Sequence, residues 1–327
     1  SYLMMAVAAL AMVGCSQNDI TDLRTDANPA ISFGVYTGTQ TRGGVTVNDT
    51  LQKNGFGILA YATGTSDWQG TTETPNFMHN QKVTHDATSG WTYTPVKYWP
   101  NGTDKITFFA YAPYESTPAT GASKGIVLSR NTVGYNPTIT FAVKDVAADM
   151  VDLVVDNEQV RKTSASGTVN FNFKHILSRV NLAAKSAVDL SGDTKIVVTD
   201  VKILGNTGSK FYEKGTYTAN LATGNGAWEA GSPFTADYGL DHILVKNTHY
   251  YRDYEKKGAI LSKKGVEVPL FIGDQYLFLI PPGNLAEGDI KLKIEYDVVA
   301  NSATDNNKAL VSNVVRTVSL PAAPMNK

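Results

Sequence analysis

Residues 30–36 read AISFGVY, and their alternation of residue types recurs along most of the chain. Ile31, Phe33 and Val35 are apolar, and small or polar residues stand between them. An alternation of period two places the apolar side chains on one face of an extended segment. The stretch therefore predicts a β-strand with one buried face, which carries Ile31, Phe33 and Val35.

Similar short stretches follow one another, separated by turns rich in Gly, Asn, Asp and Pro. The predicted strands are 56–62, 91–94, 106–112, 126–129, 138–143, 151–155, 169–173, 180–184, 195–204, 215–219, 268–272, 276–280, 290–298 and 314–320. Only residues 175–178 and parts of 234–256 favour short helices. Many short strands with frequent turns favour antiparallel sandwiches over a parallel α/β sheet. We therefore expect an all-β protein with few short helices.

The length of 327 residues suggests two domains, each large enough to bury its own core. The stretch ASGT at 165–168 has the composition of a linker. We therefore expect one domain over residues 30–163 and a second over 164–327.

Charge and composition exclude some classes of function. The 29 basic and 30 acidic side chains nearly cancel, so no strong field would attract nucleic acid. A hydrophobic fraction of 42% with 10% aromatic residues is typical of folded material and not of a disordered chain. We expect no nucleic-acid partner.

The first residues predict an exported lipoprotein. Residues 3–14, LMMAVAALAMVG, are apolar or small but too few to span a membrane, which takes about 20 residues. They read as the apolar region of a signal peptide over 1–14, and the following Cys15 completes a stretch that resembles a lipobox. A buried N-terminal helix with an incidental cysteine is the alternative. As the single cysteine, Cys15 also excludes disulfides within the chain and any zinc cluster of cysteines.

We expect acylated Cys15 to be the mature N-terminus, joined to the fold by a polar tether over 15–29. Ser16 follows the cysteine, and without an aspartate there we expect the outer membrane or the cell surface as the location. The chain begins at Ser1 without an initiator Met, so we expect that its start is cut.

No stretch predicts catalysis, a cofactor or a metal site. Gly121, Ser123 and Gly125 match the spacing of a hydrolase nucleophile elbow, but that elbow needs a preceding strand and a following helix. The five histidines show no HExxH pattern. The aspartates at 145, 149, 152 and 156 favour solvated carboxylates, with weak calcium binding as the alternative. We expect a protein that is not an enzyme.

A group of aromatic residues has two interpretations. Trp91, Tyr93, Tyr98 and Trp99 lie within nine residues of one another. Aromatic rings stack on the apolar faces of sugars, so an exposed group would form a binding patch. The alternative is that these rings belong to the core of a sandwich.

Several stretches together resemble the fimbrillin lipoproteins (Mfa1/FimA-like) of Bacteroides and its relatives, which are the pilins of type V pili. Besides the lipobox they are PAISFGVYTGTQTR from 29, GFGILAYATG from 55, KYWPNGTDKITFFAYAP from 97, VDLVV from 151, VNFNFKHILSRVNL from 169 and YLFLIPP from 276. The resemblance covers nearly all of the chain after Cys15. It implies two tandem transthyretin-like antiparallel β-sandwich domains, export as a lipoprotein and no catalysis.

The resemblance also implies how such a subunit assembles. A protease specific for arginine cuts in the loop after the first strand, the strand is lost, and a C-terminal segment of the next subunit fills the vacancy. Arg42, followed by Gly43, matches that cleavage loop, and Ile31, Phe33 and Val35 match the displaced strand. The alternatives are that Arg42 is an ordinary exposed arginine or that Arg24 in the tether is cut.

The family implies a donor segment beyond the final stretch VVRTVSLPAAPMNK, so we expect that the second domain is truncated at its end. A true end would favour a tip subunit, which only accepts a strand. Asp49, Thr50 and Leu51 resemble an O-glycosylation site of these bacteria, with an unmodified loop as the alternative.

We therefore expect a structural or adhesive subunit, stalk or tip, of a type V pilus. Its expected partners are other pilin subunits, an arginine-specific protease, the lipid of the outer membrane and a host glycan or protein. The alternative is a surface lipoprotein of the same fold that binds a glycan or host protein and never polymerises.

Overall fold

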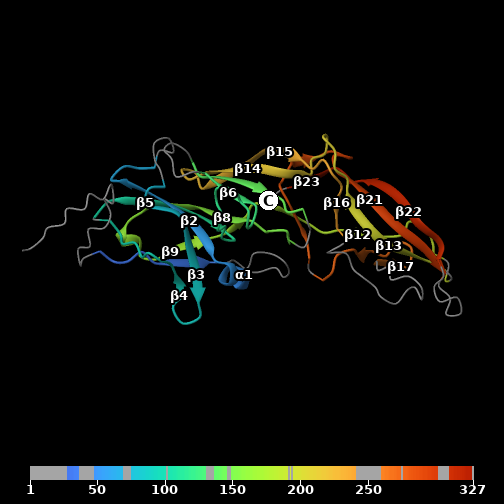
Figure 1. Cartoon of the computed structure of the whole chain (residues 1–327), viewed down its shortest axis with the longest axis horizontal. Helices are drawn as coiled ribbons and strands as arrows, with labels where there is room; N and C mark the ends of the chain where they lie inside the picture. Colours follow the sequence, from blue (N-terminus) through green and yellow to red (C-terminus); the bar gives the residue numbers. More distant parts are fainter. Residues whose placement is uncertain are drawn as a thin grey trace, which may run out of the picture.

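The computed structural model describes residues 28–36, 48–68, 75–100, 102–129, 136–145, 149–190, 192, 194–240, 259–273, 275–300 and 309–325. The molecule is elongated, and its strands form two lobes that follow one another along the long axis (Figure 1). The prediction of an all-β fold built from antiparallel sheets is confirmed. Within the described ranges, no helix is long and apolar enough to cross a membrane.

Two sheets build the first lobe. The larger has the order β10-β8-β5-β2-β3-β4, with bounds Lys174–His175, Val154–Lys162, Lys105–Ala112, Phe56–Gly64, Met78–Asp86 and Gly90–Thr92. The smaller has the order β15-β14-β7-β6, with bounds Asn225–Pro233, Tyr212–Asn220, Thr138–Ala142 and Ile126–Leu128.

The second lobe is built around the sheet β16-β13-β21-β22, with bounds Tyr238–Gly239, Thr194–Ile203, Lys291–Ala300 and Ala309–Ser319. Strand β17, Ala259–Leu261, also pairs with β13. Three short antiparallel pairs are also present: β11 with β19, β12 with β18 and β20 with β23. Their bounds are Ser178–Val180, Leu277–Leu279, Ala183–Ala184, Val268–Pro269, Gly283–Leu285 and Ala323–Met325.

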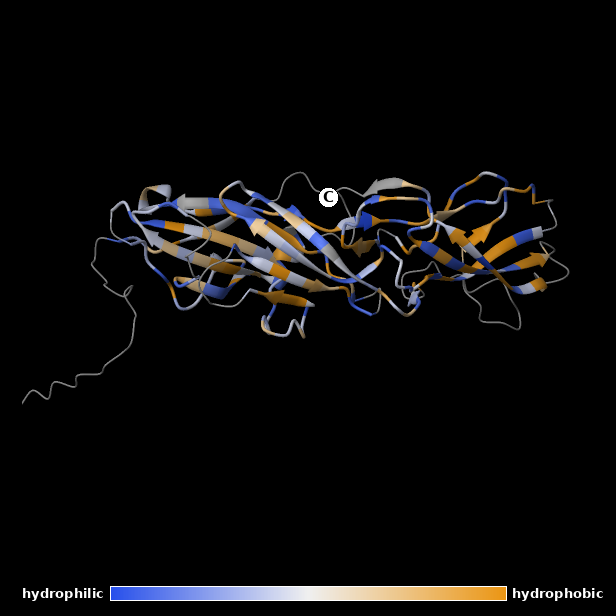
Figure 2. Cartoon of the chain, turned by 90° about the horizontal axis from the view of Figure 1, so that it is seen from above, coloured by the Kyte–Doolittle hydropathy of each residue, from blue (hydrophilic) through white to orange (hydrophobic). Residues whose placement is uncertain are grey.

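Strands β2 and β5 are buried on both faces, which explains why their sequences are almost continuously apolar. Phe56 and Phe108 point into one core, whereas Leu59 and Phe109 point into another on the opposite face. Apolar residues accordingly follow the strands of the first lobe and continue into the second (Figure 2).

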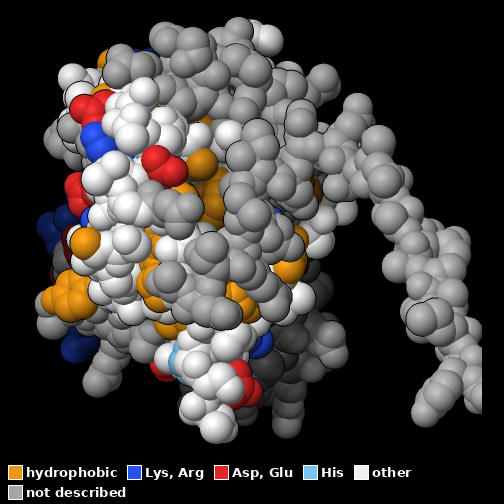
Figure 3. Space-filling view, turned by 90° about the vertical axis from the view of Figure 1, so that its left-hand side faces the viewer, with side chains coloured by type: hydrophobic (Ala, Val, Ile, Leu, Met, Phe, Trp, Pro, Cys, Tyr) orange, Lys and Arg blue, Asp and Glu red, His pale blue; other side chains and the backbone are white. Residues whose placement is uncertain are grey.

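The first core contains the buried residues Ile31, Phe33, Leu51, Phe56, Ile58, Ala60, Phe77, Met78, Val83, Trp99, Ile106, Phe108, Ala110, Ala112, Val154, Val169 and Phe171. It is closed by β1, Phe33–Tyr36, by β9, Val169–Asn172, and by the helix α1, Asn48–Asn54. The second core is larger, because it lies between the two sheets of the first lobe and continues into the second lobe. In the end-on view of the first lobe, apolar side chains reach the described surface among mostly uncharged neighbours (Figure 3).

The expected division of the chain between residues 163 and 164 needs correction. Strands from both sides of that point pair with one another: β1 with β9, β8 with β10 and β7 with β14. A cut there would therefore divide three sheets. The ASGT stretch instead contributes to a short 3-10 helix, Ser164–Ser166, which returns the chain to the same core.

Local predictions failed where side-chain alternation is interrupted. The helix expected at 175–178 is wrong: β10 and β11 flank two consecutive buried residues, Ile176 and Leu177. Strand β8 begins at Val154, later than the predicted start. Strand β3 was missed because Asn80 has a φ of 51°, which disrupts the alternation of period two.

Candidate functional site

The first predicted strand closes the first core by pairing with two separate segments of the chain. Residues 29–31 lie antiparallel to 97–99, and the Ile31 N–H donates to Lys97 O at 2.9 Å. The chain then continues into β1, which pairs with β9. One extended segment therefore spans the gap between these two neighbours.

The pairing of β1 with β9 is parallel, with Phe33 opposite Val169 and Tyr36 opposite Asn172. Among the strand pairs of the described ranges it is the one parallel pair, and all others are antiparallel. Parallel pairs are slightly less stable for each residue than antiparallel pairs. The hydrogen-bonded pairing that holds β1 to β9 is therefore of the less stable, parallel kind.

Ile31 and Phe33 enter the first core as predicted, with 2% and 5% of their surfaces exposed. The Phe33 ring centroid lies 5.0 Å from that of Tyr93, 5.8 Å from Phe108 and 5.7 Å from Phe171. Aromatic pairs at such distances are favourable beyond the burial of their area. Phe33 is therefore the main apolar anchor of the strand.

The strand leaves the core toward its end. Val35 is half-buried and packs against the first core, whereas Tyr36 is 65% exposed. Of the three predicted inward residues, Val35 thus contributes least.

Polar contacts hold the same segment in place. The Tyr93 hydroxyl lies 2.9 Å from Ile31 O, and it accepts the Lys97 N–H at 3.2 Å. Burial raises the pKa of Tyr93, so the phenol keeps the proton that it donates. The hydroxyls of Ser32 and Thr168 are 2.8 Å apart and join β1 to the segment before β9.

Removal of β1 would leave an apolar groove with a free strand edge. Its walls would be Phe108, Tyr93, Val169 and Phe171, which now contact the strand. A Cβ built on Gly34 would lie 2.2 Å from Oδ1 of Asn170, an exposed side chain on the face of β9 opposite the core. The sequence analysis did not identify Val169 and Phe171 on β9 as partners of the first strand. The alternation of VNFNFK predicts a strand, but it does not say which strand pairs with it.

Of the four aromatic residues at 91–99, Trp91, Tyr93 and Trp99 pack in this core. Trp99 is 2% exposed, and Trp91, Tyr93 and Tyr98 are half-buried. The Trp91 ring packs edge-on against Phe56 at 5.1 Å. The geometry of these three rings agrees with the core interpretation.

The Gly121, Ser123, Gly125 stretch lies in a loop organised by a buried carboxylate. Glu115 is fully buried and accepts the backbone N–H groups of Thr117, Ser123 and Lys124. Burial raises the pKa of Glu115, but these hydrogen bonds outweigh it and hold the pKa below its ordinary value of 4.5. This loop precedes strand β6 and no helix, so the elbow geometry is not formed. No pattern in the sequence pointed to Glu115.

The glycines of this loop have conformational roles. Gly121 and Gly125 have φ values of 68° and 78°, and a Cβ on Gly125 would lie 2.3 Å from Ala142 O. Their spacing therefore reflects a tight turn against β7.

The aspartates and histidines are dispersed. Asp156 is buried and accepts the N–H groups of Glu158 and Asn172, whereas Asp145 and Asp149 are exposed. Asp152 lies 3.0 Å from His175 Nδ1. In the part of the chain that the structure describes, no three His, Cys, Asp or Glu side chains form a metal-binding group.

Four residues of the predicted processing scheme, Cys15, Arg24, Arg42 and Gly43, lie outside the described residues. Thr50, the predicted modification site, lies on α1 and is half-buried. The predicted lipidation and cleavage sites therefore stay predictions.

Comparisons with known proteins agree with the resemblance seen in the sequence. The profile of the fimbrillin-like family matches residues 41–320. Fimbrium subunit Fim1C of Phocaeicola vulgatus is 40% identical over 346 residues, covering 99% of this chain and 89% of that protein. A crystal structure of a fimbrial protein from Bacteroides vulgatus is 36% identical with a TM-score of 0.77, covering 90% of this chain and 91% of the other.

Both relatives are fimbrial by name, and each match spans nearly the whole of both chains. The chain belongs to the fimbrillin-like family.

Proposed function

We propose that this protein is a structural or adhesive subunit, stalk or tip, of a type V pilus, that it has no catalytic activity, and that it polymerises by strand exchange after proteolysis. The observation that carries the proposal is β1, a short extended segment that seals the first core and pairs in parallel with β9. Arg42 follows Tyr36 by six residues, so cleavage after Arg42 would separate β1 from the remainder of the fold.

The loss of β1 has a large energetic consequence. Burial of Ile31 and Phe33 contributes about 1.5 to 3 kcal/mol each, and half-buried Val35 contributes less. The sum of roughly 3 to 7 kcal/mol is an upper figure, because unfolded chains are already partly compact. It is comparable with the total stability of a domain, which is about 5 to 15 kcal/mol. A nicked subunit would therefore recover much of its stability if another strand filled the groove.

The groove has the features of a strand acceptor. The edge of β9 would regain free N–H and C=O groups, which favour the addition of another strand. Apolar side chains at alternate positions of the incoming strand would replace Ile31 and Phe33.

Export and anchoring complete the proposal. A lipobox at Cys15 with two or more acyl chains would hold the subunit in the outer membrane until cleavage. Its partners in this scheme are other pilin subunits and an arginine-specific protease, and a host glycan or protein is the target of adhesion.

The test uses the uncleaved chain and a protease specific for arginine. We expect cleavage after Arg42, followed by saturable binding of a fluorescent peptide that carries residues 29–37. Size-exclusion chromatography and intact mass should show that the peptide occupies the nicked chain after β1 has left. A peptide that fills the groove removes any dependence on the subunit's own donor segment.

The Arg42→Lys variant is the matched control, because it keeps the charge but not the cleavage site. It should remain intact and bind no peptide, whereas Arg24→Lys should behave as the wild type. A nicked chain that retains β1 and excludes the peptide would refute strand exchange. That result would favour a surface lipoprotein that does not polymerise.

A further inference from the structure

A cavity away from the first strand offers a second site. It has a volume of about 410 Å³, within the range of roughly 300 to 1,000 Å³ that is usual for small-molecule sites. α1 contributes Thr50 and Asn54, and the loop before β6 contributes Ser123 and Lys124. The remaining walls are Pro113, Lys144 and residues 149–152.

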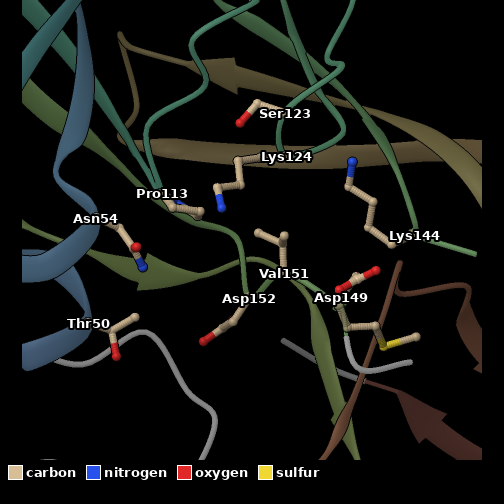
Figure 4. A pocket seen from close by; sticks show the side chains of 10 residues that line it. Thr50, Asn54, Pro113, Ser123, Lys124, Lys144, Asp149, Val151 and Asp152 are labelled. Carbon is tan, nitrogen blue, oxygen red and sulfur yellow. The ribbon is translucent and has the colours of Figure 1, made fainter. Parts of the chain in front are cut away.

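Two ammonium groups border this cavity. In Figure 4 Lys124 points into the same space as Asn54 and Val151, while Lys144 and Asp149 lie on one side of it. Among the described residues, neither lysine forms an ion pair. The lining therefore offers two cationic groups, Lys124 and Lys144, alongside the carboxylates of Asp149 and Asp152.

The backbone that carries Lys124 is fixed. Buried Glu115 accepts the N–H groups of Ser123 and Lys124, and Gly125 closes the turn against β7. A preorganised loop binds with a smaller loss of conformational entropy than a loose one. Glu115 thus acts on this cavity through the loop that it holds.

The remaining lining limits the class of ligand. Thr50, Asn54 and Ser123 can donate and accept hydrogen bonds, as ligand hydroxyl groups require. Two carboxylates, Asp149 and Asp152, also line the cavity, and a multiply charged anion such as phosphate would be repelled by them. Asp152 is already paired with His175 at 3.0 Å. The chemistry favours a ligand with one negative charge and several hydroxyls.

We propose that this cavity binds the carboxylated sugar residue of an acidic glycan, with Lys124 and Lys144 at the carboxylate and Thr50, Asn54, Ser123 and Asp149 at the hydroxyls. Pro113 and Val151 supply an apolar wall for the sugar ring. The site is independent of strand exchange, because all of these residues lie outside β1. Binding to the uncleaved monomer therefore succeeds or fails separately from assembly.

The experiment titrates the intact chain with sodium glucuronate, followed by saturation-transfer NMR and calorimetry. We expect saturable binding with a dissociation constant of about 1 mM or tighter, and no binding of glucose at equal concentration. The Lys124→Gln/Lys144→Gln double variant should lose about a hundredfold in affinity, since each of the two charge-assisted hydrogen bonds is worth about tenfold. The charge-matched pair Lys263→Gln/Lys264→Gln, exposed in the second lobe, should leave the affinity unchanged.

Three results would overturn the proposal: no saturable binding, equal affinity in the Lys124→Gln/Lys144→Gln variant, or phosphate binding as tightly as glucuronate. If that variant does not fold, the affinity of the wild-type chain for glucuronate, measured at increasing salt concentration, tests the same proposal. It should fall as ionic strength rises, because the contact with the lysines is screened, and an affinity insensitive to salt would refute the assignment.

Discussion

Replacement of Phe33 by alanine tests whether the first strand is held by its apolar anchor. The ring is 5% exposed and has aromatic neighbours on three sides, at 5.0, 5.7 and 5.8 Å. Truncation of a buried phenylalanine to alanine costs about 3 to 5 kcal/mol, from lost burial and the cavity that remains. We expect the free energy of unfolding of the first lobe to fall by an amount in this range.

Urea unfolding monitored by tryptophan fluorescence measures this loss, since Trp99 is buried in the same core as Phe33. For a slope of about 2.5 kcal/mol/M, the midpoint should fall by about 1 to 2 M. Phe33→Leu keeps most of the apolar volume and should lose less than half as much. After cleavage at Arg42, Phe33→Ala should also accelerate exchange of β1 for an added peptide.

Tyr36→Ala is the matched control, because Tyr36 lies on the same strand and is 65% exposed. Its effect should stay within about 0.5 kcal/mol. If the midpoint of Phe33→Ala fell no further than that of Tyr36→Ala, β1 would not be a stabilising part of the first core. The energetic argument for strand exchange would then be wrong.

Two further predictions concern the loop held by Glu115. The folded pKa of Glu115 lies below its ordinary 4.5, so its contribution to the free energy of unfolding is present above that pH and is lost as the pH falls through the folded pKa. Glu115→Gln should lower the free energy of unfolding by about 2 to 4 kcal/mol at neutral pH and should flatten the pH dependence of stability below about pH 4.5. A variant whose stability falls with acid as steeply as that of the wild type would refute the assignment. Gly125→Ala should lower the thermal midpoint more than Gly90→Ala: both glycines have positive φ, which costs alanine about 1 to 2 kcal/mol, but only the Cβ at 125 meets the Ala142 carbonyl oxygen, at 2.3 Å. Equal midpoints for the two variants would contradict the tight approach.

Local pattern was sufficient for much of the first lobe. Alternating residues at 31, 33 and 35 predicted an inward face, and two of these three side chains are fully buried. Continuous apolar runs at 56–62 and 106–112 correspond to β2 and β5. These predictions succeeded because the period of a strand depends only on its own backbone.

Two strands rich in polar residues or glycine escaped prediction. β3 places only Met78 and Val83 fully in the core, and its bulge at Asn80 breaks the alternation. β15 contains two glycines and a proline, so its sequence reads as a turn. Both strands exist because a neighbour supplies the hydrogen bonds, which no local pattern records.

The sequence by itself determined the fold class, the inward face of the first strand and the position of Arg42 behind it. Only the tertiary structure decided that β1 pairs in parallel with β9, that strands from both sides of residue 163 share sheets, and that Glu115 orders the loop beside the cavity. Alternation is a local property, whereas pairing depends on contacts between residues more than a hundred positions apart, such as Phe33 and Val169. A strand's partner and direction are therefore set by how the whole chain packs.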